Sequence, residues 1–238
     1  MLAYDGTGLH GWQTQPGVPT VQGILLDAAH RLFPGDVRVV GASRTDAGVH
    51  ALGQTVALSA DSRLPAVTVR AALNAHLPRQ IRVAAAADAP AGFDARRAAH
   101  GKRYAYLIDN GPVPSPLLLR YAWHVPGPLD PDAMRAGLAA LRGRHDFSAF
   151  CAAPGREVEP TCRVRALHVR RRKSVVAIVV SADRFLHHMV RTLAGSAVQI
   201  GRGARPPAWL AEVLASGDRT EAGPTAPAHG LILLRVTY

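Results

Sequence analysis

The stretch Gly41–Gln54 constrains the fold more than any other part of the chain, because it places a polar loop between two short apolar runs. Apolar residues lead in over Val37–Val40 and lead out over Thr55–Leu58, a pattern that predicts strand, loop, strand. Glycines within the loop permit positive φ or a close approach of backbone. Arg44 and Asp46 stand two residues apart in it, so we expect a rigidly held carboxylate at a sheet edge. The ordinary alternative for an Arg-x-Asp triplet is a structural aspartate that caps a turn.

Hydrophobic periodicity predicts an α/β organisation in two halves. Apolar residues recur at helical spacing over Val21–Phe33, and Thr20 is a suitable N-cap for that helix. The first half gives the order strand, helix, strand, strand, helix, strand, which is typical of a ferredoxin-like or RRM-like unit. The second half again mixes strands with helices: Asp130 is expected to cap one helix, and an apolar helix is expected over Phe185–Ile200.

Net charge and cysteine content indicate the kind of partner and the compartment. The 238 residues carry a formal net charge of +11, and arginine greatly outnumbers lysine, which favours a polyanionic partner. A genome-wide preference for Arg and Ala would give the same balance. Cys151 and Cys162 stand eleven residues apart, and we expect reduced thiols in a cytoplasmic protein. No apolar run approaches the ~18 residues of a membrane span, so we expect no membrane association and no signal peptide.

The loop that contains Asp46 resembles the active-site signature of a known enzyme family. Arg44-Thr45-Asp46-Ala47-Gly48-Val49-His50, followed by Gly53-Gln54, is similar to the signature of the TruA family of tRNA pseudouridine synthases. Ser43 stands where that family usually has glycine, and serine disfavours the positive φ that glycine permits. The first strand looks short beside the family pattern, so we expect further residues upstream of Met1. Other matching segments are Tyr4-Asp5-Gly6, Gly11-Trp12-Gln13, Phe93-Asp94-Ala95-Arg96, Gly101-Lys102-Arg103-Tyr104-Ala105-Tyr106, Phe185–Arg191 and Thr225-Ala226-Pro227-x-x-Gly230-Leu231.

The resemblance implies a fold and an activity. It implies two ferredoxin/RRM-like α/β (α+β) halves that share an extended, mainly antiparallel sheet with a central cleft. We expect residues 1–97 to form an N-terminal domain that carries the Asp46 loop, and residues 98–238 to complete the cleft. The implied activity is isomerisation of uridine to pseudouridine at positions 38, 39 and 40 in the anticodon stem-loop of tRNA. The resemblance also implies a cytoplasmic homodimer that works without a cofactor.

The same resemblance assigns roles to individual residues. Asp46 is implied as the catalytic residue, and either Arg44 or Arg191 can supply the positive charge that an ionised carboxylate needs in a low-dielectric site. The family pattern pairs Asp46 with Arg191, stacks Tyr104 on the target uracil and closes the pocket with Leu231. Tyr106 is expected in the core. Together with an RNA-modifying site, the basic residues Arg96, Lys102 and Arg103 are expected to contact tRNA phosphates.

Metal chemistry is not expected, and three other functions stay open. Adjacent histidines on a helix point about 100° apart, so we expect that His187 and His188 do not chelate one ion. A synthase of other RNA specificity, such as one for rRNA, would share the motifs, and a non-catalytic RNA-binding module would share the fold. A phosphodiesterase or nuclease would need a carboxylate cluster or metal ligands, and none stands around Asp46 in the sequence.

Overall fold

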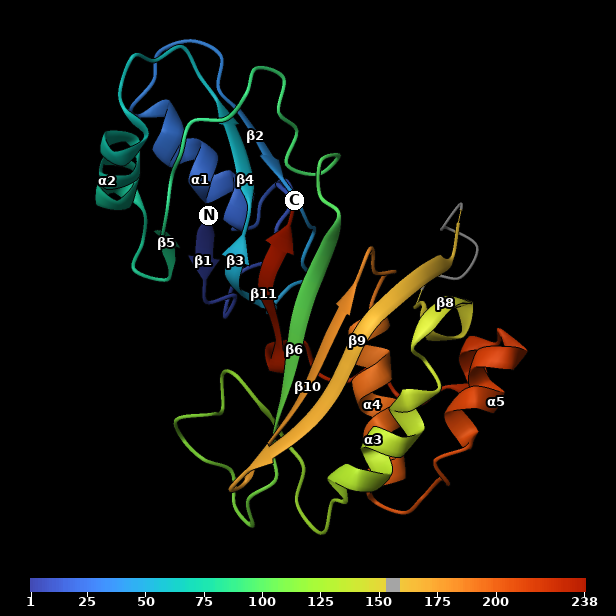
Figure 1. The fold of residues 1–238 in the computed structure, drawn as a ribbon. Helices are drawn as coiled ribbons and strands as arrows, with labels where there is room; N and C mark the ends of the chain where they lie inside the picture. The colour runs from blue at the N-terminus through green and yellow to red at the C-terminus, as the bar shows by residue number, and fades with distance from the viewer. Residues whose placement is uncertain (153–158) are drawn as a thin grey trace. The chain divides into compact units, whose positions relative to one another are not determined.

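The computed structural model describes residues 1–152 and 159–238, which form two compact units (Figure 1). The first unit is Met1–His100 together with Ile232–Tyr238, and the second unit is Gly101–Leu231. The boundary expected between residues 97 and 98 lies close to the junction after His100. The last strand departs from the expected division, because it belongs with the first unit and pairs with a strand there.

The first unit contains a sheet in the order β5-β1-β3-β11 and two helices. In this sheet β1 is antiparallel to both β3 and β5, whereas β11 runs parallel to β3. β2 and β4 form a separate antiparallel pair. The bounds are β1 Leu2–Tyr4, α1 Val21–His30, β2 Arg38–Gly41, β3 His50–Gln54, β4 Val56–Ser59, α2 Ala66–His76, β5 Ile81–Val83 and β11 Leu231–Thr237.

Local signals account for α1 but not for β3. The Thr20 hydroxyl accepts a hydrogen bond from Gly23 N at 3.2 Å, which confirms the predicted N-cap. The helix ends at His30, three residues before the predicted end, because Pro34-Gly35 follow and the last turn is irregular. The expectation of one loop up to Gln54 is wrong, since β3 occupies its second part. Four of the five residues of β3 are buried, so no alternation of polar and apolar residues marks it as a strand.

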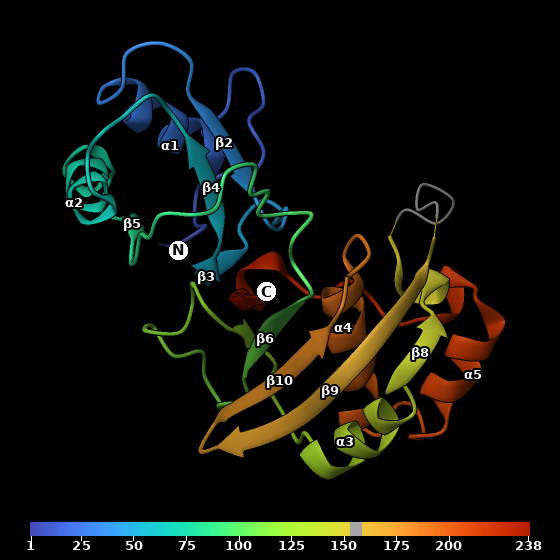
Figure 2. The ribbon, with the colours of Figure 1, turned by 45° about the horizontal axis from the view of Figure 1, so that its top comes forward.

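The second unit contains a sheet in the order β6-β10-β9-β8, and each pair of neighbouring strands in it is antiparallel. The short strand β7 pairs with β6 in parallel. Helices α3 and α4 pack together and against one face of this sheet, so that α4 lies behind β9 and β10 in the view of Figure 1. Figure 2 shows the same elements tilted by 45°, with the top of Figure 1 brought forward. The bounds are β6 Gly101–Asp109, β7 Trp123–His124, α3 Pro131–Ala139, β8 Gly143–Asp146, β9 Thr161–Arg172, β10 Val175–Ala182, α4 Met189–Gly201 and α5 Trp209–Ser216; single 3₁₀ turns cover Ser148–Phe150, Arg219–Glu221 and Ala228–Gly230.

The start of α4 differs from the prediction. Asp130 caps α3 as expected, because its carboxylate accepts hydrogen bonds from Asp132 N at 2.8 Å and Ala133 N at 3.1 Å. The helix predicted from Phe185 begins only at Met189, since His188 has a φ of 60° and its left-handed backbone stops the helix there. Phe185 and Leu186 therefore lie outside the helix, and His187 and His188 form a turn ahead of α4.

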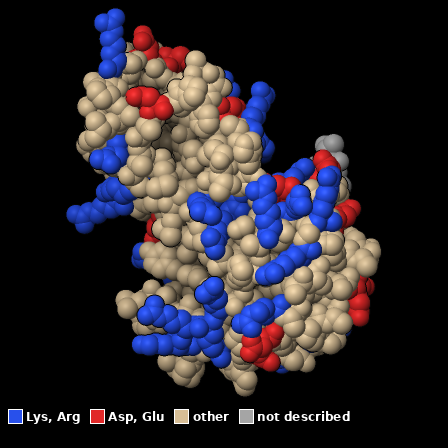
Figure 3. Space-filling view, viewed as in Figure 1, with Lys and Arg blue, Asp and Glu red and all other residues tan. Residues whose placement is uncertain are grey.

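The predicted α/β fold with a large, mainly antiparallel sheet is confirmed. The shared cleft stays a prediction. Cys151 and Cys162 are both buried thiols. Among the helices of the described residues, none is long and apolar enough to cross a membrane. Figure 3 shows basic side chains gathered over the face of β9 and β10 that turns away from α4.

Candidate active site

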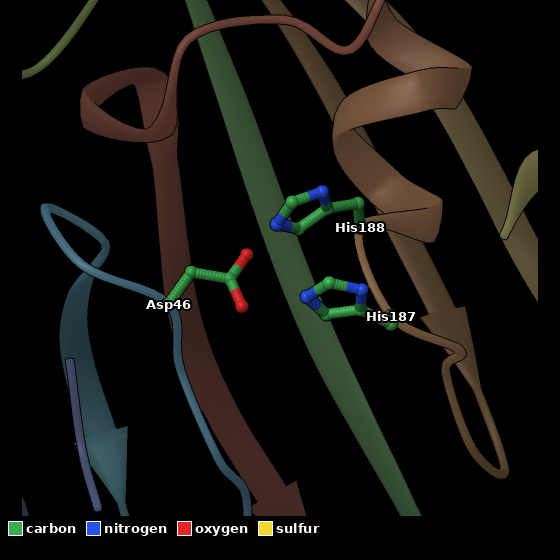
Figure 4. Close-up of side chains that lie close together, drawn as sticks. All are labelled: Asp46, His187 and His188. Carbon is green, nitrogen blue, oxygen red and sulfur yellow. The ribbon is translucent and has the colours of Figure 1, made fainter. Parts of the chain in front are cut away.

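Asp46 projects from the loop between β2 and β3 (Figure 4). Hydrogen bonds hold the backbone on both sides of it. Trp12 N donates to Thr45 O at 2.9 Å, and Val49 N donates to Asp46 O at 3.1 Å. The Thr45 hydroxyl also lies 2.8 Å from the Tyr4 hydroxyl. Asp46 itself is half-buried. The loop therefore fixes the Cα of Asp46 while part of the residue stays accessible.

Two glycines let a second segment press against this loop. A Cβ on Gly11 would lie 2.6 Å from Thr45 O, and a Cβ on Gly6 would lie 2.2 Å from Val49 O. Gly11 also has a φ of +83°, which L side chains rarely adopt. The approach of this segment is what allows Trp12 N to reach the Asp46 loop. The sequence marked both glycines only as parts of matching motifs and did not assign them this role.

Gln54 closes the loop from the other side. Its side-chain amide donates to Ser43 O at 2.6 Å and accepts from Ser43 N at 3.2 Å, and the residue is fully buried. Ser43 is not among the non-glycine residues of positive φ, which in the described chain are Lys173 and His188. Serine is thus compatible with the backbone at position 43, where the family usually has glycine. Gln54 is a third residue, after Gly6 and Gly11, whose positioning role the sequence did not reveal.

Arg44 and Arg96 are exposed in the first unit. Arg44 shares the loop with Asp46, as predicted. Arg96 lies in a turn held by Asp94, whose Oδ1 accepts from Arg96 N at 2.8 Å and from Arg97 N at 2.9 Å. These two N–H groups, that of Arg97 first, lower the pKa of the Asp94 carboxyl below its usual value.

Tyr104 and Tyr106 lie on β6 and face the helix side of the sheet in the second unit. Tyr104 pairs across the sheet with Val180, is 5% exposed and meets the ring of Phe185 edge-on at 5.1 Å. Tyr106 is fully buried, as predicted, and its hydroxyl donates to Pro227 O at 2.8 Å. Burial raises the pKa of the Tyr106 phenol far above its usual value, and the nearby charge of Arg191 offsets this only in part.

Arg191 stands in the first turn of α4 and is half-buried. Its Nε donates to Ala226 O at 2.8 Å, and Ala226 N donates back to Arg191 O at 3.1 Å. This reciprocal pair fixes the side chain against the segment that leads to Leu231. Leu231 is the first residue of β11 and is 7% exposed.

His187 and His188 precede α4, and their rings stack at 3.8 Å with 28° between the planes (Figure 4). The prediction that they diverge by a helical step is wrong, because neither residue is in the helix. His188 has a left-handed backbone, which for a residue other than glycine costs about 1–2 kcal/mol.

Lys102 and Arg103 lie on opposite faces of the second unit's sheet. Lys102 pairs with Ala182, which is buried on the helix side, whereas Arg103 pairs with Ser181 on the other side. The buried Nε of Arg103 has no hydrogen-bond partner among the described residues. Of the predicted site residues, Asp46, Arg44 and Arg96 therefore belong to the first unit, and Arg191, Tyr104, Leu231, Lys102 and Arg103 to the second.

Comparison with known proteins identifies the family. A family model described as tRNA pseudouridine synthase matches residues 1–96 and 138–238. The chain belongs to this family. The tRNA pseudouridine synthase A of Myxococcus xanthus is 45% identical over 238 residues, which cover 100% of this chain and 90% of the relative. Those of Brevibacillus brevis and Moorella thermoacetica are 42% and 44% identical, with 100% of this chain and 98% and 97% of the relatives covered.

The resemblance read from the motifs is thus confirmed, and the chain is a TruA-type tRNA pseudouridine synthase, an isomerase with tRNA as substrate. The motifs singled out in the sequence supply two parts of the synthase that hydrogen bonds hold in place. One is the loop that carries Asp46 in the first unit, and the other is the start of α4 with Arg191 in the second. Hydrogen bonds to backbone atoms hold both segments before substrate binds. Binding therefore costs less conformational entropy than it would if these segments were mobile loops.

Proposed function

We propose that this synthase isomerises uridines 38, 39 and 40 in the anticodon stem-loop of tRNA, with Asp46 as its catalytic residue. The observation that carries the proposal is the geometry of the Asp46 loop. Backbone hydrogen bonds hold the residues before and after Asp46, and the close approach at Gly11 leaves the loop little room to move. Catalytic groups work best when their position is fixed by the surrounding structure before substrate binds.

The chemistry needs a carboxylate and a confined base. The N1–C1′ bond of uridine breaks and a C1′–C5 bond forms, C5 loses a proton and N1 gains one, so the isomer has the same atoms as the substrate. The Asp46 carboxylate can attack the base, attack C1′ of the ribose or remove the C2′ proton. All three routes begin with the ionised carboxylate, and the choice among them stays open.

The proposal assigns the counter-charge to Arg191. A guanidinium stabilises an ionised carboxylate best where water is excluded and its own position is fixed. Arg191 is half-buried and is bonded through Nε to Ala226 O, which restricts its side chain. Arg44 is exposed, so water and salt screen its charge more strongly, and its proposed role is contact with the RNA near the target.

Tyr104 and Leu231 are proposed to bind the uracil. An aromatic ring stacked on a base stabilises the complex by roughly 1–3 kcal/mol. The edge-on contact with Phe185 supports this role because it holds the plane of the Tyr104 ring. Arg96, Lys102 and Arg103 are proposed to contact phosphates near the target nucleotide, and their charge rather than their geometry supports this assignment.

The proposed setting is a cytoplasmic homodimer, as the family resemblance implies. Sedimentation velocity checks the dimer: a species of twice the 25.2 kDa chain mass is expected at micromolar concentration. A monomer that is fully active at the same concentration contradicts it.

Mapping of pseudouridine in defined RNAs tests the proposed function. Purified protein is incubated with an unmodified tRNA transcript that carries uridines 38, 39 and 40, and with a matched transcript in which cytidines replace them. Pseudouridine is expected at those three positions of the first transcript and nowhere in the second. Pseudouridine elsewhere, or in rRNA fragments, contradicts the specificity. Tight binding without any pseudouridine indicates a non-catalytic RNA-binding module.

A further inference from the structure

The face of the second unit's sheet that turns away from α3 and α4 carries a row of arginines. Along β9 the residues that face the helices, Val164, Leu167 and Val169, are buried. The strand register places the intervening residues on the opposite face, across from small apolar residues of β10 such as Ala177. We call this surface the arginine face; its exposed basic residues are Arg144, Arg163, Arg170 and Arg172.

Basic residues outnumber the acids beside the arginine face in the described chain. The β8 register places the exposed Asp146 on the same face as Arg144, and Asp183 accepts a hydrogen bond from Arg163 N at 2.8 Å. Neither β9 nor β10 contains an aspartate or glutamate. On the neighbouring β6, Asp109 is buried and accepts hydrogen bonds from Gly111 N and Ser115 N. Arg144 has an exposed partner in Glu159, at 3.5 Å. Figure 3 shows this face as a field of many basic side chains, separated by neutral ones, with fewer acidic ones. Such a field attracts a polyanion rather than an apolar or mixed protein surface.

The free edge of β9 extends this basic surface. β8 pairs with β9 only at Thr161–Val164, and beyond that point two arginines of the α3 region cap the edge. Arg135 Nη2 donates to Val169 O at 3.2 Å, and Arg142 Nη2 donates to Leu167 O at 2.8 Å. These guanidinium groups block the addition of another strand to the edge. They also line, together with Arg170, a hollow of about 320 Å³ that can admit a phosphate group.

The arginine face cannot take up the target base, because Tyr104 and Arg191 lie on the other side of the same sheet. Tyr104 pairs with Val180, which is buried on the helix side, and Arg191 is held in the first turn of α4. A polyanion bound to the arginine face therefore contacts a different side of the sheet from the one that carries Tyr104 and Arg191.

We propose that the arginine face is a second contact surface for tRNA, which binds phosphates outside the anticodon stem-loop. The inference rests on the proposed function for its ligand, but it assigns a distinct surface. Each phosphate neutralised by an arginine releases counterion with a slope of about −0.7 to −0.9 in log K against log salt. At 0.1 M salt this slope corresponds to an affinity about six-fold higher for each contact than at about 1 M salt.

The test compares two triple variants with the same change in charge. The variant of the arginine face is Arg163→Gln with Arg170→Gln and Arg172→Gln. The control replaces three exposed arginines elsewhere, Arg31, Arg38 and Arg120, by glutamine. For both variants, the affinity for a full tRNA transcript and for an isolated anticodon stem-loop is measured from about 0.05 to about 0.3 M salt, the range that gives the counterion-release slope.

The arginine-face variant is expected to bind full tRNA up to about 10²-fold more weakly than wild type at 0.1 M salt, with a slope smaller by about 2 to 3. Its binding of the isolated stem-loop, and its rate of pseudouridine formation in that stem-loop, should match those of the control. Thermal unfolding checks that the fold is intact, and if the triple variant is unfolded, Arg170→Gln alone should show about a third of the change in slope.

Three outcomes overturn the inference. Equal affinities of the two variants for full tRNA mean that the face does not bind RNA. Equal losses for full tRNA and for the stem-loop mean that it belongs to the target site. Conversion of a dimer to a monomer in the arginine-face variant alone means that a second copy of the chain occupies the face. If wild type forms no pseudouridine, the proposed function fails, yet the binding comparison still decides whether this surface holds RNA.

Discussion

Replacement of Gly11 by alanine tests whether the position of Asp46 depends on the close approach of the neighbouring segment. A Cβ at residue 11 would lie 2.6 Å from Thr45 O, and ordinary contacts begin at 3.4 Å, so the Thr45 carbonyl must move by about 0.8 Å. The same carbonyl accepts the hydrogen bond from Trp12 N. Thr45 directly precedes Asp46, so the carboxylate moves with it.

The expected effects on rate and stability follow from this displacement. A misplacement of roughly 1 Å in a catalytic group can lower the rate by about 10²-fold, which corresponds to about 2.7 kcal/mol in the barrier. Alanine at a φ of +83° also costs about 1–2 kcal/mol of folding free energy. The loss of the Trp12 hydrogen bond adds about 1 kcal/mol. For a chain of this length, 1 kcal/mol lowers Tm by about 2–4 °C, so Gly11→Ala should unfold about 4–12 °C below wild type.

Gly8 provides a matched control. Its φ is +74°, but a Cβ there has no neighbour within 4 Å. Gly8→Ala should therefore show the backbone cost alone, a fall in Tm of about 2–8 °C, and retain the wild-type rate. The assay is single-turnover pseudouridine formation at saturating enzyme, with Tm measured in parallel. A wild-type rate for Gly11→Ala would refute the argument that this contact sets the position of Asp46.

Three further variants probe other parts of the site. Asp46→Asn should lower single-turnover pseudouridine formation by at least about 10³-fold while tRNA affinity changes less than about three-fold; a turn-capping aspartate would instead tolerate asparagine and keep its rate. Tyr106→Phe leaves Pro227 O without its donor and should lose about 1–3 kcal/mol of unfolding free energy below pH 10. Because burial raises the pKa of Tyr106 in the folded state, the contribution of Tyr106 to the free energy of unfolding falls as pH rises above about 10. The difference in unfolding free energy between wild type and Tyr106→Phe, measured with denaturant, should therefore narrow above that pH. A constant difference contradicts the burial argument. His188→Gly should keep the wild-type Tm or exceed it, whereas His188→Val should lower it by several degrees, since the backbone at φ 60° accepts glycine and rejects β-branched residues; equal Tm values for the two count against a left-handed residue.

Elements marked by local signals were predictable from the sequence. Thr20 and Asp130 are short polar residues ahead of apolar helical patterns, and both cap helices as predicted. The start of α4 was not predictable in this way. The residues from Phe185 onward match helical spacing, but spacing carries no information about the left-handed backbone of His188. The strand β3 was missed because its burial on both faces removes the alternation that identifies a half-buried strand.

The motifs in the sequence marked the candidate site residues, but not the geometry that surrounds them. The motifs marked Asp46 and Arg191, and the family comparison confirmed what the motifs imply about the enzyme class. The groups that fix these two side chains are mainly backbone atoms, such as Trp12 N beside Thr45 and the Ala226 peptide beside Arg191. Any residue type can supply a backbone N–H or carbonyl, so the sequence carries almost no trace of these partners.

Ser43 shows how the same reasoning separates replaceable glycines from necessary ones. The family pattern has glycine at position 43, yet serine fits here, because both bonds to Gln54 use the backbone of Ser43 and the residue is not in the positive-φ region. Gly11 combines a positive φ with a Cβ position 2.6 Å from a backbone oxygen, and both conditions exclude larger residues. The constraint on the Asp46 loop therefore lies in the segment that presses on it. A glycine inside the signature can change while Gly11, which stands outside it, cannot.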